Sequence, residues 1–265
     1  MNRLLDRFDH FLIDLDGVVY LGDQPTPCAA ETFTALHQAG KRRLFITNDP
    51  RHTADGYATK LARLGIPADP AEFLTSGRAA ALYLQREGKT GRPIFVVGSD
   101  GLRSEIEAVG GHVLKGNEGV AAEIVVVGGH EHFSYQELKI ATLAIQRGAA
   151  FIATNRDANF PMPDGLWPGT GPIVAAIEVA TGITPVVVGK PEKLIFEIAL
   201  DLFPPGGRCA IVGDRLDSDI LGGQRAGLAT ILVLSGCTTA AMAERGPIRP
   251  DYVIENFSRL TTPLS

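Results

Sequence analysis

The sequence predicts an α/β protein built on a mainly parallel sheet, and two observations support this. Short runs rich in β-branched residues alternate with stretches that carry apolar residues at helical spacing, as in successive βα units. Polar residues directly follow several of the short runs, as they do where the carboxyl ends of strands form a ligand site.

The expected elements follow from these two patterns. Strands are expected at residues 11–13, 43–46, 94–97, 124–127, 151–153, 186–188, 209–212, 230–234 and 252–254. Helices are expected at residues 29–39, 54–64, 134–147 and 191–202. Gly40, Gly65 and Gly148 stand where the C-caps of three of these helices are expected.

Length and composition are those of an ordinary globular protein. The chain has 265 residues, of which 45% are apolar and 21% charged, so it can bury a sizeable core, and two domains are favoured over one. A net charge of −5 argues against nucleic acid as a partner, because binding to a phosphate backbone needs a basic face.

Cysteine usage and hydropathy favour a cytoplasmic protein without a membrane partner. Cys28, Cys209 and Cys237 are odd in number and widely spaced, which indicates reduced structural thiols rather than disulfides or a zinc site. The N-terminus leads directly into the first expected strand and leaves no room for the apolar core of a signal peptide. No later run reaches the length needed to span a membrane.

Two carboxylates follow the first expected strand. Asp14 and Asp16 would share one face of an extended chain, and such a like-charge pair is costly unless a cation such as Mg²⁺ lies between them. Asp14 could attack phosphorus and form an aspartyl-phosphate, while Asp16 could protonate the leaving alkoxide and later deprotonate water. A charged Asp-x-Asp-Gly turn explains the tetrapeptide equally well when it is taken alone.

Two known loop motifs that bind a metal ion or a phosphate do not match this sequence. An EF-hand loop needs glycine at its sixth position, whereas Gly17 stands at the fourth. The chain contains no Gly-x-x-x-x-Gly-Lys-Ser/Thr motif, which disfavours a P-loop kinase or NTPase.

Polar groups also follow the second expected strand. The Thr47 hydroxyl and the amides of Asn48 could hold phosphoryl oxygens without adding charge. A Thr-Asn-Asp-Pro turn is the stronger explanation of this segment alone, because Asn, Asp and Pro all favour turns.

Two later strand ends supply the opposite charge and a third carboxylate. Lys190 follows an apolar run, where its ammonium needs an anionic partner such as a phosphate or Asp14. A solvated lysine before a helix that begins at Pro191 explains this segment equally well when it is taken alone. Asp214 follows another run and is a further oxygen ligand for Mg²⁺. Asp219 could orient Lys190 or a metal-bound water, with helix capping as the competing role, and Asp217 is expected to be solvated.

Together, the four motifs in this order resemble those of the haloacid dehalogenase-like (HAD) hydrolase superfamily. Its members combine an Asp nucleophile, a second Asp two residues on, a Thr or Ser, a Lys and a terminal acidic motif with Mg²⁺. Asp16 favours a phosphatase within it, because the dehalogenases lack this carboxylate. Further segments resemble the NagD-like, 4-nitrophenylphosphatase and pyridoxal phosphate phosphatase branch, namely residues 16–20, 133–135, 153–157, 168–171, 189–191 and 213–216.

This resemblance implies a Rossmann-like, doubly wound parallel-sheet core with an inserted α/β cap domain. The interval from Thr47 to Lys190 is much longer than that from Asp14 to Thr47, so the insertion follows the second motif. We predict a catalytic core of residues 1–78 and 187–265 and a cap of residues 79–186 that determines substrate specificity. Dimers formed through the cap are implied as well.

The resemblance also implies Mg²⁺-dependent hydrolysis of a phosphomonoester. The carboxylates of Asp14 and Asp214 and the backbone carbonyl of Asp16 would bind Mg²⁺, which leaves the Asp16 side chain for proton transfer. Thr47, Asn48 and Lys190 would hold the phosphoryl group.

Candidate contacts to the leaving group lie in the predicted cap. They are Asn155, Arg156, Asp157 and Gly169, the last in a Gly-Thr-Gly loop that follows no expected strand and lacks the spacing of a dinucleotide fingerprint. Sugar phosphates, glycerol phosphate, pyridoxal phosphate and nucleoside monophosphates are all compatible substrates. A phosphotransferase or mutase using the same aspartyl-phosphate, and a binding protein with a vestigial site, are the alternative functions.

Two segments depart from the family pattern. Asp49 stands where many members have a second Asn, which brings a negative side chain near an anion site. His130-Glu131-His132 stands where relatives often carry an Asp, and the pair of histidines is better explained by a solvated loop than by a metal site, which needs three or four ligands.

Overall fold

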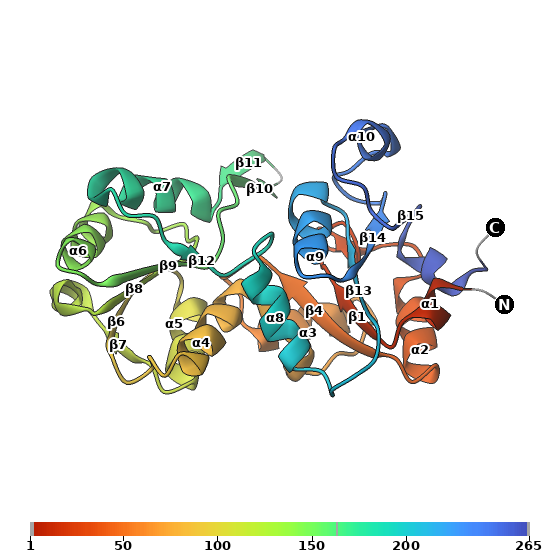
Figure 1. Cartoon of the computed structure of the whole chain (residues 1–265), viewed down its shortest axis with the longest axis horizontal. Coiled ribbons are helices and arrows are strands. Elements are labelled where there is room, and N and C mark those ends of the chain that lie inside the picture. Colours follow the sequence, from red (N-terminus) through yellow and green to blue (C-terminus); the bar gives the residue numbers. More distant parts are fainter. Residues whose placement is uncertain (1–2, 163, 264–265) are drawn as a thin grey trace. The chain divides into compact units, whose positions relative to one another are not determined.

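The computed structural model describes residues 3–162 and 164–263, and the chain divides into two compact units (Figure 1). Unit 1 comprises Met1–Thr47, Ala54–Leu74 and Lys190–Ser265, and unit 2 comprises Asn48–Thr53 and Thr75–Gly189. The predicted assignment of a catalytic core and a specificity cap stays a prediction, taken up below.

A six-stranded sheet forms the centre of unit 1. Its order is β15 (Tyr252–Ile254), β14 (Ala229–Val233), β13 (Cys209–Gly213), β1 (His10–Ile13), β4 (Arg42–Thr47) and β5 (Phe73–Thr75). β1 pairs in parallel with β13 on one side and with β4 on the other. Because β1 is central, its four residues are buried, and the last three, Phe11–Ile13, form a continuous apolar run.

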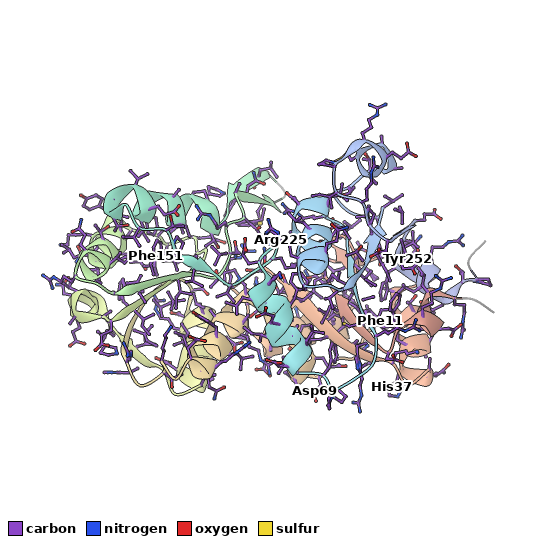
Figure 2. All side chains as sticks on the ribbon, viewed as in Figure 1. Phe11, His37, Asp69, Phe151, Arg225 and Tyr252 are labelled. Carbon is purple, nitrogen blue, oxygen red and sulfur yellow. The ribbon has the colours of Figure 1, made fainter. Side chains whose placement is uncertain are left out.

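Helices and short turns cover this sheet. They are α1 (Leu4–Arg7), α2 (Ala29–Gln38), α3 (Ala54–Arg63), α8 (Lys193–Asp201), α9 (Leu221–Arg225) and α10 (Ala240–Arg245), with the β2 (Tyr20–Leu21) and β3 (Gln24–Pro25) hairpin. Phe11 of β1 packs in one buried cluster with Phe33 of α2 and Phe45 of β4, and Figure 2 labels Phe11 on its strand. Burial of each such ring stabilises the fold by about 1.5–3 kcal/mol.

A second parallel sheet forms the centre of unit 2. Its order is β12 (Val186–Val187), β9 (Ala150–Ala153), β8 (Ile124–Val127), β6 (Pro93–Val97) and β7 (His112–Leu114). Helices α4 (Ser76–Arg86) and α5 (Asp100–Ala108) lie on the face opposite α6 (Tyr135–Gln146) and α7 (Thr170–Thr181) (Figure 1). Phe151 of β9, labelled in Figure 2, belongs to the buried cluster under α6 and α7. The antiparallel hairpin β10 (Asn159–Met162) and β11 (Gly165–Pro168) precedes α7.

The α/β prediction is confirmed, and three local expectations are wrong. The run at 186–188 pairs with β9 in unit 2 and is not a strand of the unit 1 sheet. A short helix, α1, precedes the first strand. β11 directly precedes Gly169, although its mostly exposed residues lack the alternation that would have revealed it.

The described residues include no helix of the length and apolar character that a membrane crossing requires.

Candidate active site

Three predicted site residues lie at the carboxyl ends of neighbouring strands of the unit 1 sheet. Asp14 follows β1, Thr47 ends β4, and Asp214 follows β13. All three are buried, and the Asp14 amide donates to the carbonyl of Val212 at 2.9 Å, which continues the β1–β13 ladder by one bond. Because parallel strands end at one edge, the sheet brings these side chains together.

Lys190 joins this group through two short ion pairs. Its Nζ lies 2.6 Å from Oδ1 of Asp14 and 2.7 Å from Oδ1 of Asp219, and it also donates to the carbonyl of Ile46 at 3.3 Å. The Lys190 and Asp219 side chains are almost completely buried. The predicted role of Asp219 in orienting Lys190 is therefore consistent with the geometry, since Asp219 also accepts from the Arg215 amide at 3.1 Å.

Three carboxylates in this group could hold a metal ion. One oxygen each of Asp14, Asp214 and Asp219 lies within 4.8 Å of the others. Lys190 offsets one of the three negative charges, so the cluster has an excess of negative charge in a buried place. Hard oxygen donors with excess negative charge suit Mg²⁺, and the residues present therefore fit that ion.

Backbone glycines surround the Asp214 carboxylate. A Cβ on Gly17 would lie 2.5 Å from Oδ2 of Asp214, and a Cβ on Gly236 would overlap the same oxygen. Gly17 also has φ of +79°, which favours glycine. The Cys237 amide donates to Oδ2 of Asp214 at 2.6 Å, which fixes the orientation of the carboxylate.

The excess negative charge appears in the pKa values of the cluster. Burial, together with the nearby Asp219 carboxylate, raises the pKa of Asp214 to about 6. Burial and the two neighbouring carboxylates also raise the pKa of Asp14 well above its ordinary value, although Lys190 opposes this. Burial disfavours charge on Lys190, but Asp14 and Asp219 outweigh it and raise the pKa of the ammonium, which stays charged.

Asp16 lies outside the buried carboxylate cluster. β1 ends at Ile13, before both aspartates, and the expectation that Asp14 and Asp16 share one face of the chain stays a prediction. The Asp16 side chain is exposed and accepts a hydrogen bond from the Tyr20 hydroxyl at 3.4 Å. The Tyr20 ring is fully buried beneath the Lys60 ammonium, which lies 3.7 Å from its centroid.

Asn48 and two predicted leaving-group residues contact one another in unit 2. The Asn48 side-chain amide donates to both Asp157 oxygens at 3.1 and 3.2 Å. The Asn155 amide donates to the Asn48 carbonyl at 2.6 Å, and Asn155 is buried. Asn48 is thus oriented by the loop that follows β9.

The other two predicted leaving-group residues also have partners in unit 2. Arg156 forms an ion pair of two hydrogen bonds with Glu178 of α7. Gly169 is the N-cap of α7, and a Cβ there would overlap the Asp157 carbonyl. A close backbone approach therefore explains why a glycine stands at position 169.

Asp49 is neutralised within its own turn. Its oxygens accept from Arg51 Nε at 2.8 Å and Nη2 at 3.1 Å, and from His52 Nδ1 at 3.0 Å. Burial opposes ionisation, but the hydrogen bonds from His52 and Arg51 hold the pKa of Asp49 well below its ordinary value. The expected negative charge near the anion site is therefore compensated locally.

Replacement of Asp49 by alanine is expected to lower the free energy of unfolding by about 1–3 kcal/mol at pH 7, because two charged hydrogen bonds are lost. A carboxylate with a depressed folded-state pKa stabilises fully above its unfolded pKa and loses this effect as pH falls toward the folded value. Urea unfolding should therefore show a deficit that shrinks below about pH 4. Asp100→Ala removes an exposed carboxylate paired with Arg103 and should change stability by only a few tenths of a kcal/mol. An equal effect of both variants would contradict the assignment.

The predicted solvated loop at 130–132 is only partly solvated. His132 and Glu131 are exposed, but the His130 side chain is only 8% exposed and its Nε2 lies 3.5 Å from Oε1 of Glu137. Burial lowers the pKa of His130, so the ring is neutral at pH 7. Across residues 3–162 and 164–263, the carboxylate cluster described above is the group with metal-binding geometry, and these histidines are not part of it.

Comparison with known proteins identifies many relatives along the whole chain. A model of haloacid dehalogenase-like hydrolases matches residues 11–112, and a second HAD-hydrolase-like model matches residues 187–260. The chain is 35% identical over 255 residues to an acid sugar phosphatase of Staphylococcus haemolyticus, covering 96% of this chain and 95% of the relative.

Two solved structures show the same fold over nearly the whole chain. A 4-nitrophenylphosphatase of Thermotoga maritima superposes with a TM-score of 0.90 at 34% identity, over 98% of both chains. A glycerol phosphate phosphatase of Mycobacterium tuberculosis in complex with magnesium superposes with a TM-score of 0.89 at 36% identity, over 98% of this chain and 78% of that one.

Proposed function

The chain belongs to the haloacid dehalogenase-like hydrolase family and is a phosphatase, and we propose that it hydrolyses a small phosphomonoester through an aspartyl-phosphate on Asp14. The observation that carries this proposal is the buried group of Asp14, Lys190, Asp214 and Asp219 at the carboxyl end of β1. A nucleophilic carboxylate, a fixed cation and two further carboxylates are the groups that two successive phosphoryl transfers need.

Asp14 is the nucleophile in this proposal. Its Oδ1 is held by Lys190, so the second oxygen can attack phosphorus in line while the bond to the leaving oxygen breaks. Water then attacks phosphorus, the Asp14 carboxylate leaves, and inorganic phosphate is released.

Asp16 moves protons in both steps. Its exposed carboxyl group donates a proton to the departing alkoxide and afterwards takes one from the attacking water. The exposure of the Asp16 side chain supports this division of labour, because solvent can reach its carboxyl group, whereas Asp14 is buried.

Mg²⁺ would be held by the carboxylates of Asp14 and Asp214 and the Asp16 backbone carbonyl. When bound, it neutralises the excess negative charge and polarises the phosphoryl oxygens. The Cys237 amide positions Asp214 for this role, and Asp219 positions Lys190.

Thr47, Asn48 and Lys190 hold the phosphoryl group. The Lys190 ammonium offsets the charge that develops on the oxygens, and the Thr47 hydroxyl at the end of β4 adds a neutral donor. Asn48 is the next residue in the chain, and its hydrogen bonds with Asp157 and Asn155 fix its orientation within unit 2.

The stereochemistry of the reaction at phosphorus tests this mechanism. Two in-line displacements each invert the configuration, so a phosphomonoester made chiral with oxygen isotopes should transfer its phosphoryl group with net retention to an alcohol acceptor. Net inversion would mean direct attack by the acceptor and would overturn the covalent intermediate. Addition of a chelator should abolish turnover, and Mg²⁺ should restore it.

A phosphotransferase or mutase would use the same aspartyl-phosphate. The exposed position of Asp16 favours hydrolysis, because solvent reaches the base that would activate water. The ratio of transferred to released phosphate at rising acceptor concentration distinguishes the two, and transfer that exceeds hydrolysis at millimolar acceptor would reverse the assignment.

Replacement of Tyr20 by phenylalanine is expected to lower kcat/KM about 3–10-fold for alkyl phosphates, because Asp16 loses the hydroxyl that orients it. For 4-nitrophenyl phosphate, whose leaving group needs no proton, we expect less than a twofold change. Tyr252→Phe removes a hydroxyl that accepts from Arg7 and should affect neither substrate. Equal loss on both substrates would mean that Tyr20 acts on the phosphoryl site rather than on Asp16.

A dimer formed through unit 2 is also part of the proposal. Val179 and Ile183 near the end of α7 and Val186 on edge strand β12 are exposed apolar residues, and β12 is the outer strand of its sheet. Light scattering should report twice the chain mass, and Val179→Lys should return it to that of one chain. A mass equal to that of one chain for the wild-type protein would exclude the proposed dimer.

A cytoplasmic location is the last part of the proposal. Cys28, Cys209 and Cys237 are free thiols, as is usual in a reducing compartment. Fractionation of cells that express the protein should recover it with cytosolic markers, and recovery with secreted proteins would exclude this location.

A further inference from the structure

The loop between β14 and α10 contacts two parts of the unit 1 site. Residues 235–237 of this loop come soon after β14, at the carboxyl edge of the sheet (Figure 1). The Cys237 amide donates to Oδ2 of Asp214 at 2.6 Å, and the Ser235 hydroxyl donates to the Gly17 carbonyl, also at 2.6 Å. One short loop thus holds both the Asp214 carboxylate and the turn that follows β1.

The loop is itself anchored at both ends. The Leu234 amide donates to the Ile254 carbonyl at 3.0 Å, which extends the ladder between β14 and β15 by one bond. The Leu234 side chain also packs against a small buried apolar cluster. At the other end, the Thr239 side chain caps α10 and accepts from the Met242 amide at 3.3 Å. A hydroxyl on such a loop is a fixed support for the turn that it contacts.

Gly17 is the flexible point of that turn. Its φ of +79° lies in the region that favours glycine, and glycine has more backbone freedom than any other residue. A Cβ at this position would lie 2.5 Å from Oδ2 of Asp214 and 3.0 Å from Cα of Gly236. Close packing against Asp214 therefore requires a glycine, so the turn depends on hydrogen bonds rather than on a side chain for its rigidity.

Two hydrogen bonds hold Gly17, one on each side. Its amide donates to the Tyr20 carbonyl at 2.8 Å, and this amide belongs to the same planar peptide group as the Asp16 carbonyl. The Tyr20 bond lies within the turn and orders it internally. The Ser235 bond instead ties the turn to the loop that also holds Asp214. Loss of the Ser235 hydroxyl would free the turn to shift relative to Asp214.

We propose that Ser235 is a positioning residue for Mg²⁺, whose hydroxyl keeps the Asp16 backbone carbonyl and the Asp214 carboxylate at the separation that one ion needs. This inference rests on the ligand set of the proposed function and adds a residue that supports it. Mg²⁺ demands nearly ideal octahedral geometry with bonds of about 2.0–2.1 Å, so it tolerates little displacement of a ligand. A chain without the hydroxyl keeps every proposed ligand but holds one of them less firmly.

Calorimetric titration with Mg²⁺, without any substrate, tests this role directly. Ser235→Ala is expected to raise the dissociation constant of Mg²⁺ about 3–10-fold, as expected for the loss of one hydrogen bond. Ser235→Thr retains the hydroxyl and should stay within about twofold of wild type. Ser258→Ala is the matched control, because the Ser258 hydroxyl donates over the same 2.6 Å but to Asn256, in the segment after edge strand β15. An equal dissociation constant for Ser235→Ala and wild type would overturn the proposal.

The Mg²⁺ dependence of turnover supplies a second test. With 4-nitrophenyl phosphate, the Mg²⁺ concentration that gives half-maximal rate should rise in Ser235→Ala by the same factor as the dissociation constant. At saturating Mg²⁺ we expect kcat within about threefold of wild type, because the groups that react are unchanged. A lower kcat at saturating Mg²⁺ with an unchanged half-maximal concentration would mean that Ser235 acts on the chemical step, and would overturn the proposal.

Urea unfolding separates failure of this inference from failure of the proposed function. An ion that binds the folded protein raises the free energy of unfolding, so the midpoint of wild type should rise with Mg²⁺. Ser235→Ala should need about 3–10-fold more Mg²⁺ for the same rise. A lower midpoint in a chelator with the same response to Mg²⁺ would show a merely structural role for Ser235 and leave the phosphatase intact. A wild type without response to Mg²⁺ and without turnover would overturn the proposed function, and this inference with it.

Discussion

Replacement of Asp14 by asparagine is expected to lower kcat by about 10⁴-fold or more, because the amide cannot attack phosphorus. The substituted side chain has nearly the same shape and keeps one oxygen that can accept from Lys190. Turnover of 4-nitrophenyl phosphate in Mg²⁺, followed to the detection limit, measures this loss. The alternative binding protein with a vestigial site predicts no such difference, since wild type and variant would both be inactive.

The same variant should keep its fold. Asp14 is one of three buried carboxylates that share a single ammonium, and its removal lowers the excess negative charge of the cluster. We therefore expect a free energy of unfolding equal to or greater than that of wild type when both are measured in a chelator. Asp217→Asn is the matched control, because this carboxylate of the later acidic motif, close in sequence to Asp214 and Asp219, is 71% exposed and lies 3.3 Å from Nε of Arg215. Turnover by Asp14→Asn within tenfold of wild type would exclude Asp14 as the nucleophile.

The unit 1 site was largely predictable because its residues follow apolar runs. A buried strand that ends in a carboxylate or a hydroxyl is visible in the local sequence, and parallel strands place such ends at one edge. Asp14, Thr47 and Asp214 were found in this way. The pairing of Asp219 with Lys190 was one of two open alternatives for that carboxylate, and both are present: one oxygen lies beside Lys190, and the other accepts from the amide of Arg215, the N-cap of the helical turn Leu216–Ile220.

The contacts of unit 2 were not predictable from local pattern. Asn48 and Asp157 are 109 residues apart, and nothing in either segment indicates the other as its partner. The run at 186–188 has the composition of a core strand, but composition does not specify which sheet a strand joins. To place this run in the correct sheet, one would have had to know that it pairs with β9.

The contact of Tyr20 with Asp16 was not predicted for a different reason. An aromatic residue shortly after Asp-Gly is expected to pack in the core, and the Tyr20 ring is indeed fully buried. The hydroxyl that contacts Asp16 depends on the turn at Gly17, whose amide donates to the Tyr20 carbonyl at 2.8 Å. Gly17 could have indicated a tight turn at this point of the chain. It could not have indicated that the Tyr20 hydroxyl contacts Asp16.

Replacement of Lys190 by methionine is expected to have the largest effect on stability. The variant leaves Asp14, Asp214 and Asp219 together in a buried place without a cation, and loss of one partner from a buried ion pair costs about 3–5 kcal/mol. Urea unfolding in a chelator at pH 7.5 measures this loss. Lys193→Met, three residues further along at the exposed start of α8, should change the free energy of unfolding by less than about 0.5 kcal/mol.

A second substitution separates the charge effect from lost packing. If uncompensated charge causes the instability, Lys190→Met with Asp219→Asn should be more stable than Lys190→Met alone, because the pair of substitutions removes one positive and one negative charge together. If lost packing of the lysine stem causes it, the second change should add further instability, since an amide would then replace the Asp219 carboxylate that also accepts from the Arg215 amide. In either case kcat should stay at least about 10²-fold below wild type, because no ammonium group then offsets the charge on the transferred phosphoryl group. Recovery of stability without recovery of turnover would show that Lys190 has two separable roles, one in balancing the buried carboxylates and one in phosphoryl transfer.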